Sequence, residues 1–166
     1  MTSSIKLRAL EPEDLDLVYR IENDAELWQW GAGSVPLSRY TVRQYLEQQH
    51  ADIYQDGQLR LVVEADGVAV GTADLSSFDP RHLRAEVGIV ILSGHHRRGI
   101  ATLALCQLHA YAARTLHLRS LHAYTAADNL PALSLFRRLG YTEVGRLPRW
   151  IDGEHTAVMF QLLLNT

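Results

Sequence analysis

Residues 86–102 read EVGIVILSGHHRRGIAT, and a helix-like run follows from Leu103 to Arg114. Glu86 to Leu92 is almost wholly apolar, which predicts a strand that is buried on both faces at the centre of a sheet. The loop and helix that come next have the outline of a phosphate site, because the first-turn N–H groups of a helix have no internal acceptors and lie at the positive end of its dipole. Gly99 and the small Ala101 would let a ligand approach this backbone closely.

The same segment also fits an ordinary basic loop before a helix, and it matches neither of two common nucleotide motifs. It lacks the Gly-Lys-Ser/Thr ending of a P-loop and the three spaced glycines of a dinucleotide-binding turn. The prediction of an anion site therefore depends on the backbone N–H groups of residues 96–102 and not on a side-chain signature.

The rest of the chain alternates between expected strands and helices, without an internal repeat or a linker-like tract. Asp66-Gly67 separates two β-like runs, which is the strongest short-range signal of an antiparallel hairpin. Pro12 and the acidic residues after it are typical of a first helical turn. The expected strands are 5–10, 59–65, 68–75, 86–92 and 118–125, with a closing hairpin around 152–153, and the expected helices begin at residue 12 and cover 38–49 and 103–114.

The composition indicates one compact domain. Of 166 residues, 47% are apolar and 21% charged, so we expect a single domain over residues 1–166. The net charge of −3 argues against a nucleic-acid partner, because affinity for polyanions comes mostly from surplus Lys and Arg. No apolar run reaches the roughly 20 residues of a membrane span, and residues 1–6 lack a secretory pattern, so we expect a cytoplasmic protein with no membrane partner. Cys106, the single cysteine, is expected in the core.

A second motif follows the strand expected at 118–125 and reads AADNLPALSLFRRLGY from Ala126 to Tyr141. It resembles the Asn-x-x-Ala-x-x-x-Tyr/Phe-x-x-x-Gly-Phe/Tyr signature of the GNAT superfamily of N-acetyltransferases. The loop at 96–101 resembles the Gln/Arg-x-x-Gly-x-Gly/Ala acetyl-CoA motif of the same family, and the two motifs stand in the family order, roughly 30 residues apart. Among its branches, the chain looks most like the spermidine N-acetyltransferases and the related ribosomal-protein N-acetyltransferases.

The resemblance implies a single α/β (α+β) domain with the GNAT fold. That fold has a mixed sheet of about six or seven strands, antiparallel in its N-terminal part, flanked by about four helices. Two parallel central strands splay apart, and the thioester of acetyl-CoA, the cosubstrate, lies in the gap. An amine attacks the carbonyl directly in a ternary complex. In this chain the splayed strands would be Glu86 to Leu92 and Leu118 to Thr125.

The resemblance assigns most cofactor contacts to the backbone. A bulge in the first splayed strand would free an N–H group near Ile91 for the thioester oxygen. Asn129 would hydrogen-bond the pantetheine arm, or it would cap a helix instead. His96 stands where the family has Gln or Arg. The expected cofactor-binding residues are Ile89, Val90, Ile91, His96, Arg97, Arg98, Gly99, Ile100, Ala101, Thr102, Asn129 and Phe136.

Glu86 and Tyr124 are the expected catalytic residues. Glu86 would act as the base that deprotonates the amine, with a plain strand-end charge or a clamp for a substrate ammonium as alternatives. Tyr124 stands where some family members place a catalytic Glu, and His122 shares its face of the strand. Phe136 occupies a position where many relatives use Tyr to protonate the leaving thiolate. Because Phe cannot donate a proton, either Tyr124 or a water replaces that acid, or the thiolate leaves unassisted.

The acceptor amine is expected to contact two loops, Trp28 to Tyr40 and Pro148 to Thr156. The spermidine enzymes carry paired glutamates just before a Pro, and the matching stretch here, AGSVP at 32–36, has none. A polyamine or other small amine is the first expectation. A protein N-terminus as substrate, or a weakly catalytic acetyl-CoA-binding sensor, are the alternatives. The resemblance is compatible with a homo-oligomer, and the histidines lack metal-binding spacing, so no metal is expected.

Overall fold

The structure is a computed structural model and describes residues 3–30 and 33–165. Its strands are β1 (Ile5–Ala9), β2 (Leu59–Ala65), β3 (Val68–Asp79), β4 (Arg84–Ile91), β5 (Ser120–Ala126), β6 (Thr142–Ile151) and β7 (His155–Leu163). Its α-helices are α1 (Leu15–Glu22), α2 (Ala25–Trp28), α3 (Arg39–Gln48), α4 (Ile53–Asp56), α5 (Ile100–Arg114) and α6 (Leu130–Arg138), and a 3-10 turn, η1 (Pro12–Asp14), precedes α1.

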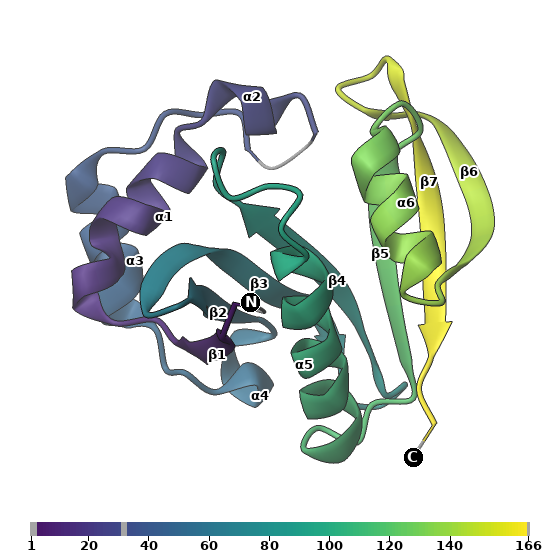
Figure 1. Cartoon of the computed structure of the whole chain (residues 1–166), viewed down its shortest axis with the longest axis horizontal. Helices are drawn as coiled ribbons and strands as arrows, with labels where there is room; N and C mark the ends of the chain where they lie inside the picture. Colours follow the sequence, from purple (N-terminus) through teal and green to yellow (C-terminus); the bar gives the residue numbers. More distant parts are fainter. Residues whose placement is uncertain (1–2, 31–32, 166) are drawn as a thin grey trace.

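The strands of the described chain form one seven-stranded sheet in the order β1-β2-β3-β4-β5-β7-β6 (Figure 1). All neighbouring pairs are antiparallel except β4 and β5, which are parallel. This arrangement confirms the predicted mixed sheet with an antiparallel N-terminal part. α2 and α4 are single turns of four residues that the sequence did not predict, and the longer helices are α1, α3, α5 and α6.

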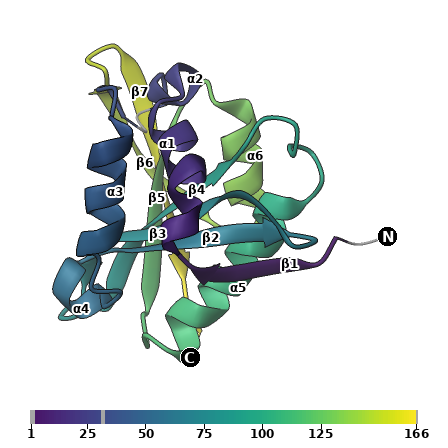
Figure 2. The same cartoon turned by 90° about the vertical axis from the view of Figure 1, so that its left-hand side faces the viewer.

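Helices cover both faces of the sheet (Figure 1, Figure 2). α5 and α6 pack on one face and form the main core with β3, β4, β5 and β7. α1 packs on the other face in a smaller cluster that includes Val62 and Leu92, and α3 contacts α1 there. Among the described residues, no helix combines the length and apolar character that a bilayer span requires.

The buried stripe of α5 corrects the expectation for Cys106. The buried residues of this helix follow one another at steps of one, three or four positions, namely Ile100, Ala104, Leu105, Leu108 and Ala112. Cys106 lies outside the stripe and is exposed, so its predicted place in the core is wrong. Apolar neighbours in sequence did not reveal which side of the helix the thiol occupies.

Both Asp-Gly turns lie where the sequence predicts them. Asp66 and Gly67 have φ values of 52° and 82°, and Asp152 and Gly153 have values of 50° and 78°. Positive φ is least costly for Gly and is enriched at Asp, so these residues suit tight reversals of the chain. The turns join β2 to β3 and β6 to β7, which confirms both expected hairpins.

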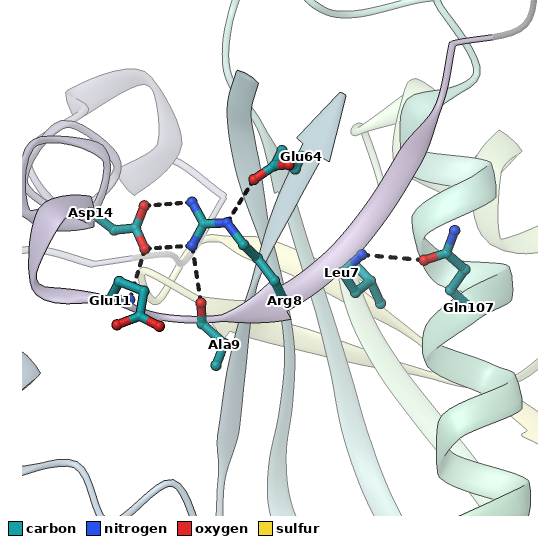
Figure 3. A network of polar contacts seen from close by, with 7 residues as sticks. All are labelled: Leu7, Arg8, Ala9, Glu11, Asp14, Glu64 and Gln107. Atoms are coloured by element: carbon teal, nitrogen blue, oxygen red, sulfur yellow. Dashed lines mark hydrogen bonds and ion pairs between the residues drawn. The ribbon is translucent and has the colours of Figure 1, made fainter. Parts of the chain in front are cut away.

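Arg8 anchors β1 to the first helical turn and to β2 (Figure 3). Its Nη1 and Nη2 atoms each donate to a carboxylate oxygen of Asp14 at 2.8 Å, and its Nε donates to Glu64 at 2.7 Å. Asp14 is buried and also accepts the Glu11 N–H at 2.8 Å. The hydrogen bonds from Arg8 hold the pKa of Asp14 below its ordinary value, although burial opposes this shift. The contact therefore stabilises the charged form of Asp14.

Gln107 of α5 binds the outer edge of β1, also visible in Figure 3. Its side-chain oxygen accepts the Leu7 N–H at 3.2 Å, and its side-chain nitrogen donates to the Ile5 carbonyl at 2.8 Å. Arg8 Nη1 donates to the Ala9 carbonyl at 3.0 Å. Side chains thus satisfy three backbone groups that β2 does not reach.

Replacing Asp14 with Asn should lower the free energy of unfolding at neutral pH by about 3 kcal/mol, because the buried end of the Arg8 contact loses its charge. The folded-state pKa of Asp14 is lowered, so its contribution is present above the unfolded pKa and is lost as pH falls through the folded pKa. In urea unfolding experiments, the difference in free energy of unfolding between wild type and variant should therefore decrease as the pH is lowered from 7 to about 3. The exposed Glu13→Gln is the matched control. A difference in free energy of unfolding that does not change with pH would contradict the role given to Asp14.

Candidate active site

A gap between β4 and β5 divides the sheet at its centre. The two strands pair at only three positions, which join residues 84–86 of β4 to residues 120–122 of β5. Beyond these pairs the strands separate, and Figure 1 shows β4 and β5 diverging on either side of the gap. The splayed parallel strands that the sequence predicts are therefore confirmed.

The edge of β4 that faces this gap carries backbone groups that β3 does not use. The Leu92 N–H donates to the Val70 carbonyl of the β3 side at 2.8 Å. Because hydrogen-bonded and non-hydrogen-bonded pairs alternate along an antiparallel ladder, the N–H and C=O groups of Ile91 and Ile89 point away from β3. The contact of His96 Nε2 with the Ile91 carbonyl, at 2.6 Å, agrees with this direction. β4 thus presents a strand edge to the gap.

The bulge expected in β4 near Ile91 is wrong. Residues 86–91 keep an unbroken register with β3. The irregular positions lie in β3, with one extra residue between 69 and 71 opposite β2 and another between 76 and 79 opposite β4. The edge of β4 is free because β5 turns away from it, so no bulge is needed to expose the N–H groups.

The loop from β4 to α5 turns through three residues with positive φ. These are Gly94, Arg97 and Gly99, with φ values of 91°, 61° and 74°. Gly99 is the N-cap of α5, and the first helical bond runs from the Leu103 N–H to the Gly99 carbonyl at 3.1 Å. The N–H groups of residues 100–102 precede this bond and have no acceptor within the helix. The helix start is therefore able to receive an anion, as the sequence predicts.

Side chains around this helix start differ in what they can offer an anion. His96 is turned back to the Ile91 carbonyl, whereas Arg97 and Arg98 are exposed. Arg138 of α6 donates from Nη2 to the Thr102 hydroxyl at 3.4 Å, so a second helix brings a cation to the start of α5. The sequence analysis did not select Arg138, because 36 residues separate it from Thr102.

Asn129 and Phe136, the cofactor residues expected from the second motif, both have structural contacts. Asn129 caps α6, and its side-chain oxygen accepts the Ala132 N–H at 3.3 Å, which leaves the amide nitrogen free to serve as a donor. Phe136 is 4% exposed, and its ring lies 5.0 Å from that of Tyr141 and 5.6 Å from that of Phe160. Phe136 therefore packs in the core, and its contact with the cofactor stays a prediction.

Glu86 lies on the sheet face opposite the main core. Its carboxylate is 3.9 Å from His122 Nε2, across the last pair that joins β4 to β5, and it accepts the Ser77 hydroxyl at 3.5 Å. Burial lowers the pKa of His122, although the charge of Glu86 opposes this shift, so the imidazole is neutral at neutral pH. The Glu86 side chain is 33% exposed and is accessible to a substrate.

Three rings form an aromatic wall beside Glu86: His122, Tyr124 and Trp150. Tyr124 lies 5.8 Å from His122 and stacks on Trp150 at 6.2 Å. Trp150 is 60% exposed and comes from the closing hairpin, where the sequence analysis expects substrate contacts. In the other expected loop, the Trp28 indole donates to the Glu22 carbonyl at 2.9 Å, and residues 31 and 32 lie outside the described residues.

Two cavities of about 300 Å³ each lie on this same face. The Glu86 cavity is bounded by Asp74 and Ser76 of β3 and by Glu86 and Gly88 of β4, together with Tyr45, Gln58 and Arg60. The helix cavity is bounded by Val18, Glu22, Leu37, Thr41 and Val42, and again by Tyr45, Gln58 and Arg60. Neither cavity was foreseen from the sequence, because their walls come from segments that are far apart along the chain.

β4 connects these features. Its edge groups at Ile89 and Ile91 face the gap, while the side chain of Glu86 faces a cavity on the sheet surface. At a rise of about 3.3 Å per residue, the edge groups of Ile89 lie about 10 Å along the strand from Glu86. The carboxylate is placed to accept a proton from a nucleophile in the cavity.

Comparison with known proteins decides the family. Residues 4–142 match the family model described as the acetyltransferase (GNAT) domain. The chain belongs to the GNAT family. It is 30% identical over 154 residues to the spermidine N(1)-acetyltransferase of Escherichia coli, covering 92% of this chain and 81% of that protein. This GNAT protein is therefore an acetyltransferase, and acetyl-CoA is the cosubstrate of such enzymes.

Solved structures support the same fold. The GNAT chain resembles the spermidine N-acetyltransferase of Vibrio cholerae in complex with CoA and spermine, with a TM-score of 0.86, 24% identity, and coverage of 96% and 95% of the two chains. It also resembles the dodecameric structure of the Vibrio cholerae spermidine N-acetyltransferase in an intermediate state, with a TM-score of 0.80, 24% identity, and coverage of 96% and 94%.

Gly71→Ala should weaken CoA binding by roughly tenfold or more, a loss of about 1.4 kcal/mol in binding free energy, because the added methyl group displaces the edge of β4. A Cβ at Gly71 would lie 2.0 Å from the Val90 carbonyl and 3.0 Å from Ile91 Cα, so β4 must shift toward the gap. Titration calorimetry with CoA measures the effect. Gly145→Ala is the control, because nothing lies within 4 Å of its added Cβ. Unchanged CoA affinity in a folded Gly71→Ala protein would show that the edge of β4 does not form the cofactor slot.

Proposed function

We propose that this GNAT enzyme moves the acetyl group of acetyl-CoA to a primary amine of a polyamine or other small alkyl amine, by direct attack within a ternary complex. The observation that carries the proposal is the position of Glu86, which lies on the strand that borders the gap and in a cavity on the sheet face. The names of the relatives from Escherichia coli and Vibrio cholerae support the amine class.

In this proposal acetyl-CoA lies in the gap along β4. The N–H and C=O groups of Ile89 pair with the amide groups of the pantetheine arm, as those of a neighbouring strand would, while the Ile91 carbonyl keeps its contact with His96. An N–H group near Ile91 stabilises the charge that develops on the thioester oxygen. The N–H groups of residues 96–102 bind the diphosphate at the start of α5, and Arg138 adds a positive charge beside Thr102.

Glu86 acts as the base in the transfer step. The amine gives a proton to the Glu86 carboxylate, directly or through a water, and its lone pair forms the new C–N bond while the C–S bond breaks. His122, whose pKa is lowered by burial, lies 3.9 Å from the carboxylate as a neutral neighbour, so it leaves Glu86 free to take up the proton. Phe136 has no proton to give, so the thiolate receives one from Tyr124 or a water, or it leaves unaided because an ordinary thiol has a pKa near ~8.5.

The charge of the two cavities favours a cationic acceptor. Their charged residues are the carboxylates of Glu22, Asp74 and Glu86 and the single guanidinium of Arg60, a net charge of −2. Beside them, the aromatic wall offers ring faces to an alkyl ammonium group. Both features attract an amine in its protonated form and hold it near the base.

The alternatives from the sequence fit this site less well. A protein N-terminus requires a groove that admits an extended peptide, whereas the acceptor space here is divided into two cavities of about 300 Å³. A weakly catalytic sensor would bind acetyl-CoA with little or no turnover of any amine, so a turnover assay distinguishes it from an enzyme.

The proposal keeps the expected cytoplasmic location and a homo-oligomer, in line with the dodecamer named for the Vibrio cholerae relative.

Incubation with acetyl-CoA and a panel of amines should release free thiol with short diamines or polyamines at rates well above those with peptides or aminoglycosides. A thiol-reactive dye follows the release, and mass spectrometry identifies the acetylated product. Turnover confined to peptides would replace the proposed acceptor with a protein N-terminus. CoA binding by calorimetry without turnover on any amine would support the sensor.

Glu86→Gln should reduce kcat/KM for the preferred amine by about 10²- to 10⁴-fold near neutral pH, because the amide cannot accept the proton. CoA affinity should stay within about twofold, since Glu86 lies on the face of β4 and not on its edge. Steady-state kinetics and calorimetry measure the two effects. Glu47→Gln on the exposed side of α3 serves as the control. Wild-type activity in Glu86→Gln would remove Glu86 from the reaction.

A further inference from the structure

The two cavities on the α1 and α3 face share three residues, Tyr45, Gln58 and Arg60. Glu86 belongs to one cavity, and Glu22 belongs to the other. The shared residues therefore form the partition between the place where an amine would react and a second space of similar volume. This partition is a feature that the transfer reaction itself does not require.

The guanidinium of Arg60 spans the partition. Its Nη1 donates to Glu22 at 2.6 Å, on the side of the helix cavity. Its Nε and Nη2 each donate to Asp74 at 3.1 Å, on the side of the Glu86 cavity. The ring of Tyr45 lies 6.0 Å from the guanidinium carbon. Ion pairs in two directions thus hold the side chain across the boundary.

The charges in this cluster do not cancel. Two carboxylates face one guanidinium, so the three residues carry a net charge of −1, and each side chain is about one quarter exposed, at 24%, 21% and 24% for Arg60, Glu22 and Asp74. Burial raises the pKa of Asp74, and the attraction of Arg60 opposes that rise. The cluster therefore retains an attraction for a further cation from the substrate. Within the cluster, Arg60 already occupies the position between two carboxylates that a distal ammonium group of a long polyamine would take.

We infer that Arg60 limits the length of the acceptor amine. Its guanidinium binds Glu22 and Asp74, where a distal ammonium group of the substrate would otherwise bind, and its side chain closes the Glu86 cavity toward the helix cavity. The inference rests on the proposed function and specifies its substrate class. Short alkyl amines and diamines fit in the Glu86 cavity with their second charge near Asp74. A longer polyamine must displace Arg60 from Glu22 before its chain can extend, and it therefore reacts less efficiently.

Arg60→Gln removes the cation and shortens the side chain, so the cavities join and both carboxylates become available to substrate. The experiment compares wild type and variant over 1,3-diaminopropane, putrescine, cadaverine, spermidine and spermine, with acetyl-CoA saturating. Wild type should show kcat/KM values that fall from the diamines to spermine. In Arg60→Gln, the ratio of kcat/KM for spermine to that for 1,3-diaminopropane should rise by roughly tenfold or more.

Arg60→Lys is the second variant, because it keeps the charge and one ion pair but lacks the fork that reaches both carboxylates. It should fold if Arg60→Gln does not, and it should raise the same ratio by about threefold. Thermal unfolding and CoA affinity check the fold of both variants. An equal fall in kcat/KM for every amine, with an unchanged ratio in both variants, would mean that Arg60 only supports the structure and would overturn the inference.

Equilibrium binding separates this inference from the proposed function. Calorimetry with the CoA-bound protein gives the affinity for each amine without need of turnover. Absence of thiol release with all amines would reject the proposed function, and the length dependence of binding would then still decide the role of Arg60. Spermine affinity that does not increase relative to diaminopropane in the Arg60 variants would reject the length limit even if the wild type is an efficient enzyme.

Discussion

The parting of β4 from β5 is the constraint on which the rest of the structure depends. Backbone N–H and C=O groups inside a protein need partners, and a strand in the middle of a sheet normally finds them on both sides. Here the pairing stops at Glu86 and His122, and the groups of Ile89 and Ile91 face a gap. A ligand with amide groups of its own can complete this edge, so the proposed cofactor site depends on backbone geometry more than on selected side chains.

Because side chains alternate along a strand, β4 serves two environments at once. Ala85 and Val87 join the core beneath α5, which fixes the strand in place. Glu86 and Gly88 face the cavity on the opposite side. The packing of Ala85 and Val87 in the core therefore fixes the backbone position of Glu86 on the other face of the strand.

The sequence predicted those parts of the fold that depend on local patterns. The apolar run of β4, the Asp-Gly turns and the start of α5 each carry their signal within a few residues. Features that depend on cross-strand register were missed or misplaced. The bulges lie in β3 and not in β4, and the ion pairs of Arg60 join segments 38 and 14 residues apart. The contact of Glu86 with His122 likewise depends on where two parallel strands stop pairing, which neither strand encodes alone.

The capped edge of β1 has a consequence for the ends of the sheet. The side chains of Gln107 and Arg8 hydrogen-bond to backbone groups of Ile5, Leu7 and Ala9 on the outer edge of β1. Few backbone groups therefore remain there to pair with a further strand. The opposite end of the sheet is β6, a ten-residue strand that is largely exposed. A long exposed edge strand is the kind of surface that can pair with another chain, so of the two ends of the sheet β6 is the more open to strand addition. Because Trp150 lies in β6, a strand paired there would lie next to one ring of the aromatic wall.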